Sequence, residues 1–251
     1  PIKPKTDNAL MFALLHTMLH EHGRNSLDIP FLRDRTASPY LVGPRGLYLR
    51  DPESRKPLVW DLDAKRAVPF DTPATALALE GRFVVDHAID VGADGDEATY
   101  AGVEAATVMS RLVEHVAPYT PEWASGISDV PAATIRRLAS EYLGHACVGE
   151  TIEIDGQTLP FRPVAVTLGK TVNNGWGAYD CVWARTVLAM LVGALEVPGG
   201  TIGTSTRLNR PQSNRLKSVT PGDDGFMATP LNPTDKENWA ASPVGRNAHS
   251  T

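Results

Sequence analysis

The sequence predicts an α/β fold with a β-hairpin-rich insertion between its first two groups of helices. Three observations carry this prediction. Apolar residues recur at helical spacing over residues 8–22, short β segments and turn formers alternate over residues 30–91, and an apolar run at residues 164–168 precedes a buried helix. A continuous apolar run that ends at a glycine is typical of a strand buried in a parallel sheet.

The first predicted helix spans residues 8–22, with Asp7 as its N-cap and Gly23 as its end. Six large apolar residues recur along it at helical spacing: Leu10, Met11, Leu14, Leu15, Met18 and Leu19. From residue 30 to about residue 91 many of the prolines occur between short β segments. We interpret this stretch as hairpins and loops that lie over a larger body rather than as a self-sufficient sheet.

Helical spacing returns over residues 103–116 and again after Pro131. The second of these helices is expected to turn four residues inward: Ile135, Leu138, Ala139 and Tyr142. A hairpin with Asp155-Gly156 at its tip should follow. The last predicted helix, about residues 177–195, is apolar almost all round and is closed by Pro198-Gly199-Gly200.

Composition excludes several classes of function. The net charge of −5 argues against a nucleic-acid partner, because phosphodiester binding needs a broad cationic surface. No apolar run approaches the roughly 20 residues of a membrane-spanning helix. The two cysteines, Cys147 and Cys181, exclude a disulfide framework and an all-cysteine zinc or iron–sulfur site, and we expect both as buried thiols. Because Pro1 begins the sequence and no signal-peptide pattern follows, we expect further chain upstream.

The start of the first helix is a candidate binding site. A carboxylate at Asp7 is favoured by the helix dipole and can accept two hydrogen bonds from the N1 and N2 donors of a guanine. Lys5, Thr6 and the first helical amides are placed to meet a phosphate or ribose. The alternative is that Asp7 is an ordinary N-cap with no ligand.

A second candidate site is the polar loop that follows residues 164–168. Its candidate binding residues are Gly169, Lys170, Thr171, Asn173 and Asn174. Ligands of open α/β sheets lie at the carboxyl ends of the strands, where glycines let backbone amides approach them. The loop is not a phosphate-binding P-loop, because Val164 occupies the position of that motif's first glycine. A purely structural turn is the alternative.

Three histidines, His16, His20 and His22, crowd the first helix. The residue after His16 is Thr17, so the glutamate of the zinc-protease motif is missing. We therefore expect solvated or hydrogen-bonded histidines. The sequence predicts no catalytic residue and no metal ligand within the chain.

The order of these features resembles the dimethyl sulfoxide reductase superfamily of molybdenum and tungsten enzymes. The first anchor, Pro4-Lys5-Thr6-Asp7-Asn8-Ala9-Leu10, is similar to the superfamily's Pro-Gly-Thr-Asp-x-Ala-Leu segment, with Lys5 in place of the common glycine. The second, residues 164–200, resembles its strand, polar loop and buried helix that ends in Gly-x-x-x-x-Pro-Gly-Gly, here residues 193–200. The loop departs from the common Gln-His-Thr at Val172-Asn173-Asn174.

Within the superfamily, three short segments look most like the branch that contains phenylacetyl-CoA:acceptor oxidoreductase. They are Phe31-Leu32-Arg33-Asp34, Ser38-Pro39-Tyr40-Leu41-Val42 and Leu47-Tyr48-Leu49-Arg50-Asp51-Pro52. The resemblance covers roughly residues 1–205. It implies that the chain is an internal fragment of a catalytic subunit. The intact subunit would act by two-electron redox or oxygen-atom transfer in anaerobic metabolism, and the fragment alone would be inactive.

The resemblance also implies a domain organisation. Residues 1–145 would be part of a Rossmann-like cofactor-binding domain with the hairpin insertion at about residues 30–100. Residues 146–205 would begin a second such domain of a larger molybdoenzyme, and residues 206–251 would be an irregular loop or tail.

The cofactor implied is bis(molybdopterin guanine dinucleotide) with molybdenum or tungsten. Asp7 would orient a guanine with help from Thr6 and Lys5, and the loop would line the pterin or diphosphate. A 4Fe-4S cluster and the metal ligand would lie elsewhere in the parent protein. Its partners would be the missing remainder of the same polypeptide, a membrane anchor and an iron–sulfur electron-transfer subunit. The resemblance does not decide whether the protein is located in the prokaryotic cytoplasm or in the periplasm. Two other classes remain alternatives: a metal-free nucleotide- or coenzyme-binding α/β module, and a purely structural segment.

Overall fold

A computed structural model describes residues 1–73, 76–93, 95–167, 177–201, 220–221 and 227–228. Its contacts divide the chain into two compact units, Pro1–Ser205 and Thr206–Thr251. The second unit contains an antiparallel pair of short strands, β8 (Thr220–Pro221) and β9 (Met227–Ala228). The candidate sites lie in the first unit.

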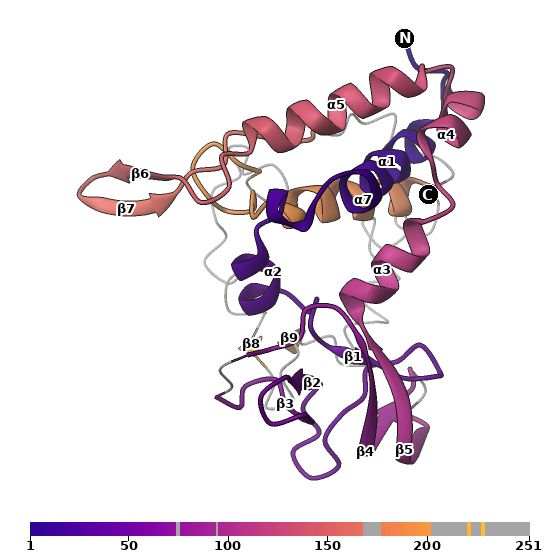
Figure 1. Cartoon of the computed structure of the whole chain (residues 1–251), viewed down its shortest axis with the longest axis vertical. Coiled ribbons are helices and arrows are strands. Elements are labelled where there is room, and N and C mark those ends of the chain that lie inside the picture. Colours follow the sequence, from indigo (N-terminus) through magenta and orange to yellow (C-terminus); the bar gives the residue numbers. More distant parts are fainter. Residues whose placement is uncertain (74–75, 94, 168–176, 202–219, 222–226, 229–251) are drawn as a thin grey trace, which may run out of the picture. The chain divides into compact units, whose positions relative to one another are not determined.

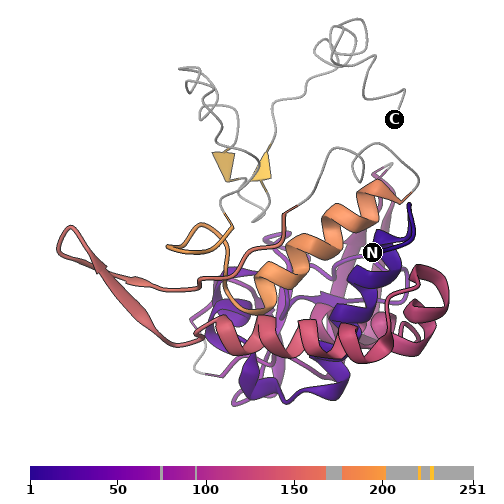
Figure 2. The same ribbon diagram turned by 90° about the horizontal axis from the view of Figure 1, so that it is seen from above.

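Helices form the larger core of the first unit. Helix α1 (Asp7–His16) packs against α4 (Pro121–Ser128), α5 (Ala132–His145) and α7 (Ala178–Leu191), as Figures 1 and 2 show. Large apolar side chains from these helices and from the turn that follows α1 fill the core, among them Leu15, Met18, Leu19, Leu188 and Leu191. No helix in the described part of the chain is long and apolar enough to span a bilayer.

The first predicted helix is confirmed in its extent but not in its detail. Helix α1 continues directly into a π-helical turn, η1 (Thr17–Glu21), and Gly23 lies just beyond it. The hydroxyl of Thr17 donates a hydrogen bond to the carbonyl oxygen of Ala13, at 2.8 Å, where the two segments join. The N-cap prediction is wrong by one residue, because Thr6 holds that position and Asp7 is the first helical residue.

The insertion is a β structure with its own core. Strands β1 (Leu41–Val42), β5 (Glu97–Thr107) and β4 (Arg82–Val91) form an antiparallel sheet in that order, and β2 (Leu58–Asp61) pairs with β3 (Arg66–Pro69). Its buried core residues are Leu41, Leu49, Leu58, Val85, Ala88 and Ala105. The prediction of hairpins is confirmed, and the hairpins have this core of their own within the same compact unit as the helices.

Two short helices, η2 (Arg24–Ser26) and α2 (Ile29–Arg35), lead from the helical core toward the insertion, and α3 (Val108–Val116) leads back (Figure 1). The predicted helix over residues 103–116 begins five residues late, because residues 103–107 belong to β5, where residues 103–106 pair with β4 and Thr107 pairs with β1. Thr107 marks the change, since its hydroxyl oxygen accepts a hydrogen bond from the Ser110 N–H at 3.2 Å and caps α3.

Beyond α5 the chain forms the predicted hairpin, β6 (Thr151–Ile154) and β7 (Gln157–Pro160), which projects away from the helices (Figures 1 and 2). Asp155 and Gly156 both have positive φ, 50° and 76°, as a two-residue hairpin turn requires. Helix α5 turns Ile135, Ala139 and Leu143 inward, but Leu138 is 36% exposed, so that part of the prediction is wrong.

The predicted parallel strand is not present in residues 164–167, the described part of the apolar run. Val164 is buried, whereas Ala165 and Thr167 are exposed, and no strand among the residues that the structure describes pairs with them. A strand needs a hydrogen-bonded neighbour, and every described sheet of the first unit is antiparallel and lies elsewhere. The fold is therefore mixed α/β with small sheets. Helix α7 ends at Leu191, four residues earlier than predicted, where Gly193 adopts a φ of +67°.

Candidate functional site

The two predicted anchors meet where the first turn of α1 lies against the start of α7. A β-carbon added to Gly177 would overlap the side-chain amide of Asn8, so this side chain lies directly against the glycine. Gly177 also adopts a φ of +73°, which residues with a side chain rarely adopt. The amino-terminal ends of α1 and α7 are therefore held side by side.

Asp7, the first residue of α1, is close enough to the start of α7 to act on it electrostatically. Burial raises the pKa of the Cys181 thiol in the first turn of α7 to about 11, and the negative charge of Asp7 adds to the increase. The carboxylate of Asp7 thus acts on the beginning of α7 across the helix pair. Each helix amino terminus carries a partial positive charge, so the junction favours a negatively charged group.

The segment before α1 is held in an unusual backbone conformation. Lys5 has a φ of +66°, a region that glycine enters without strain, which gives a physical reason for the glycine that the resembled motif carries here. The Thr6 hydroxyl donates to the carbonyl oxygen of Lys3 at 2.7 Å instead of capping α1. The Lys3 N–H in turn donates to the carbonyl oxygen of Ser128 at 2.9 Å. The amides of the first turn of α1 therefore receive no side-chain cap from Thr6.

Five predicted binding residues, Gly169, Lys170, Thr171, Asn173 and Asn174, lie outside the described residues. The described residues on either side of their loop are both tied to the same helix pair. Before the loop, the Arg185 Nε of α7 donates to the carbonyl oxygen of Val166 at 2.7 Å. After the loop, Gly177 lies against Asn8.

The histidines of the first helix are hydrogen-bonded, as predicted. His16 contacts the Val116 carbonyl oxygen through Nδ1 at 3.0 Å, and His20 contacts that of Val113 through Nε2 at 2.9 Å. His22 Nε2 lies 3.2 Å from the Ser140 hydroxyl. Among the described residues, no group of three or more potential ligands could hold a metal ion.

Sequence reasoning missed a buried ion pair between Asp28 and Arg162. Arg162 Nη2 lies 2.8 Å from Asp28 Oδ2, and both side chains are almost fully buried. Asp28 also caps α2, because its Oδ1 accepts a hydrogen bond from the Phe31 N–H at 3.1 Å. An aspartate just before Ile29-Pro30 is a recognisable helix-start signal, but nothing in the sequence indicates its partner.

Arg162 connects this helix start to the end of the second anchor. Its guanidinium donates to the carbonyl oxygens of Val192, at 3.1 Å, and of Cys147, at 3.0 Å. The backbone N–H of Arg162 donates to the carbonyl oxygen of Pro198 at 3.1 Å. A β-carbon on Gly199 would lie 2.8 Å from Cα of Pro163, so the Pro-Gly-Gly ending packs tightly on this segment. The described part of the second anchor is therefore clamped at its carboxyl end as well as at Gly177.

No family model matches the chain. It is 28% identical over 226 residues to a sulfite dehydrogenase subunit of Allochromatium vinosum, covering 80% of this chain and 21% of that protein. It is 27% identical over 146 residues to the alpha subunit of chlorate reductase from Ideonella dechloratans, covering 55% of this chain and 15% of that protein. The chain thus spans about a fifth of the length of the first relative.

Both relatives are named as subunits of oxidoreductases. The two matches support the resemblance to the dimethyl sulfoxide reductase superfamily that the motifs indicate. The phenylacetyl-CoA branch receives no support from them, because neither relative is named for that substrate.

Proposed function

We propose that this chain is a segment of the large subunit of a molybdenum oxidoreductase, and that it binds part of a bis(molybdopterin guanine dinucleotide) cofactor. The observation that carries this proposal is the contact between Asn8 and Gly177, which joins the starts of α1 and α7. The similarity to two oxidoreductase subunits supports it independently.

The residues at the start of α1 fit the polar part of such a cofactor. Asp7 is half-buried and acts electrostatically on the start of α7, so its carboxylate lies near the junction. In the proposal it accepts hydrogen bonds from N1 and N2 of a guanine. Lys5 and Thr6 assist at the ribose or a phosphate. The first amides of α1 and α7 together stabilise the negative charge of the diphosphate.

The loop between the two tied flanks completes the proposed site. Gly169, Lys170, Thr171, Asn173 and Asn174 are proposed to line the pterin or diphosphate. Support comes from the flanks, because Val166 and Gly177 fix both described ends of the loop beside α7 and α1. Glycine and small polar side chains let a bulky polar ligand approach the backbone closely.

When bound, the cofactor supplies two-electron redox or oxygen-atom transfer chemistry at molybdenum or tungsten. This chain binds and orients it, and we assign the chain neither a metal ligand nor a residue that transfers protons. The 4Fe-4S cluster, the metal ligand, any membrane anchor and the iron–sulfur partner protein belong in this proposal to the rest of the complex. The two Rossmann-like domains would be completed by chain beyond these residues.

The substrate is a separate proposal. The segments between residues 31 and 52 favour phenylacetyl-CoA, whereas the relatives are named for sulfite and chlorate. Turnover of the purified parent enzyme with each of the three compounds, under anaerobic conditions and with an artificial electron carrier, distinguishes them.

Elemental and nucleotide analysis of the purified parent subunit tests the proposed function. Molybdenum or tungsten together with GMP released by acid is the expected result. Bound nucleotide without either metal would support the metal-free coenzyme module instead. A preparation with neither metal nor nucleotide would leave a purely structural segment.

A further inference from the structure

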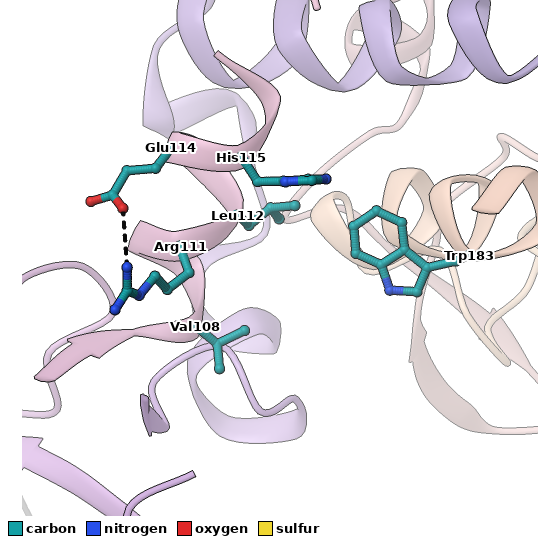
Figure 3. A pocket seen from close by; sticks show the side chains of 6 residues that line it. All are labelled: Val108, Arg111, Leu112, Glu114, His115 and Trp183. Atoms are coloured by element: carbon teal, nitrogen blue, oxygen red, sulfur yellow. Dashed lines mark ion pairs between the residues drawn. The ribbon is translucent and has the colours of Figure 1, made fainter. Parts of the chain in front are cut away.

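A cavity lies between α3 and α7 (Figure 3). It has a volume of about 550 Å³ and is lined by Val108, Arg111, Leu112, Glu114, His115 and Trp183. Val108, Leu112 and His115 follow one another at i, i+4 and i+7, so they share one face of α3. Trp183 of α7 forms the opposite wall.

Trp183 is packed against a second aromatic ring. Its indole is stacked with the ring of Phe12 of α1, with centroids 6.0 Å apart and an angle of 29° between the planes. Phe12 also meets His115 edge to face at 6.0 Å. The cavity is therefore built on packed aromatic rings from three helices.

The cavity continues into an exposed apolar stripe on α7. Tyr179, Val182 and Trp183 are 82%, 37% and 38% exposed, and they share one face of the helix. None of the three carries a charge. Exposed aromatic residues beside a hollow are typical of surfaces that another polypeptide covers.

The charges at the rim are already paired. Arg111 lies 3.8 Å from Glu114, and the other oxygen of Glu114 accepts from Arg82 at 2.6 Å. Arg82 pairs in addition with Glu104 at 3.0 Å. Two cations and two carboxylates balance one another, so the rim favours an uncharged occupant over an ionic ligand.

We propose that this surface, the α3–α7 face, packs against another segment of the same large subunit, which presents uncharged apolar side chains between Trp183 and Leu112. The inference rests on the proposed function, in which the chain is part of a longer polypeptide. The relatives leave ample chain for this role, since the matched regions are 21% and 15% of their lengths. A large apolar interface between domains would also hold the cofactor-binding segment rigidly.

Hydroxyl-radical footprinting of the intact large subunit tests this proposal without any substitution. Trp183 and Trp123 form a matched pair, because they are 38% and 39% exposed within this chain. Each is compared with itself in the urea-unfolded protein. We expect Trp183 to be oxidised at least several-fold more slowly in the folded protein, and Trp123 to retain the rate of an exposed tryptophan.

Two results would overturn the proposal. One is a Trp183 that reacts as fast as Trp123 in the isolated large subunit. The other is protection that appears only when partner proteins or a small molecule are added, which would assign the α3–α7 face to a different occupant. Metal analysis of the same sample keeps the two proposals apart, because protection of Trp183 does not depend on molybdenum.

A charge insertion gives a second readout. Val182 and Ile127 are both 37% exposed in helices of this chain. Val182→Glu should lower the Tm of the parent subunit clearly, because a carboxylate would be buried in the proposed contact. Ile127→Glu is the control and should change the Tm little. Equal effects of the two substitutions would contradict the proposal.

Discussion

Asp28 and Arg162, which are 134 residues apart, form a buried ion pair that joins the start of α2 to the end of α7. The pair also brings in the turn after α5, through the carbonyl oxygen of Cys147. A single guanidinium thus connects three parts of the chain that the sequence places far apart. It stabilises the frame in which the proposed cofactor site lies.

Removing one partner of this pair should be strongly destabilising. Asp28→Ala leaves the guanidinium of Arg162 buried without its counter-charge, which typically costs about 3–5 kcal/mol. Asp34→Ala is the matched control, because its ion pair with Arg33 is 38% and 49% exposed and should contribute less than about 1 kcal/mol. Urea unfolding of the parent subunit measures both. Similar midpoints for the two variants would mean that the buried pair does not stabilise the fold.

Gly177→Ala should disturb the junction of α1 and α7. The new β-carbon would push the side-chain amide of Asn8 out of its place, and the backbone would be strained at a φ of +73°. Gly46→Ala separates these effects, because Gly46 has a φ of +74° and open space around it. We expect a loss of bound cofactor for Gly177→Ala and full cofactor content for Gly46→Ala. If both variants retain the cofactor, the close approach is not needed for binding.

Lys5→Gly should stabilise the protein. A non-glycine residue in the left-handed region costs roughly 1–2 kcal/mol, and glycine removes most of that cost, so a gain of about 1 kcal/mol is expected. Lys3→Gly is the control, since Lys3 is not among the described residues with positive φ. Thermal unfolding tests the difference. A lower Tm for Lys5→Gly than for Lys3→Gly would show that the lysine side chain contributes more than the strain costs.

The Cys181 thiol gives the stability of the protein a dependence on alkaline pH. Its pKa is raised to about 11 in the folded chain, whereas a thiol in an unfolded chain has a pKa of about 8.5. The unfolded state therefore loses its proton first, so stability should fall as the pH rises from about 8.5 toward 11. Cys181→Ala should flatten this fall relative to Cys147→Ala. Equal slopes for the two variants, measured by urea unfolding at several pH values, would contradict this.

Local patterns predicted the elements that depend on neighbouring residues. The hairpin at Asp155-Gly156 and helices α1 and α5 follow from turn residues and helical spacing, and the structure confirms them. Residues 103–107 have the same local spacing, yet they form a strand because β4 and β1 pair with them. Long-range pairing outweighed the helical pattern there.

The candidate site was predicted only in part for the same reason. Asp7 could be found from its place at a helix start, and Gly177 from the glycine-rich segment. Their closeness depends on how α1 and α7 pack, and the partner of Asp28 depends on a contact across 134 residues. No local spacing carries that information. The run at residues 164–167 was misassigned because apolar character alone does not supply a neighbouring strand.

The cofactor content of an Asp7→Ala variant of the parent subunit tests the central claim most directly. Hydrogen bonds to a charged group contribute about 1.5–3 kcal/mol, so loss of the carboxylate should weaken guanine binding by about 10- to 100-fold. The control is Asp86→Ala, which removes an exposed carboxylate from β4. We predict a clear loss of molybdenum and GMP for Asp7→Ala alone. Full molybdenum occupancy with normal turnover in that variant would contradict the account.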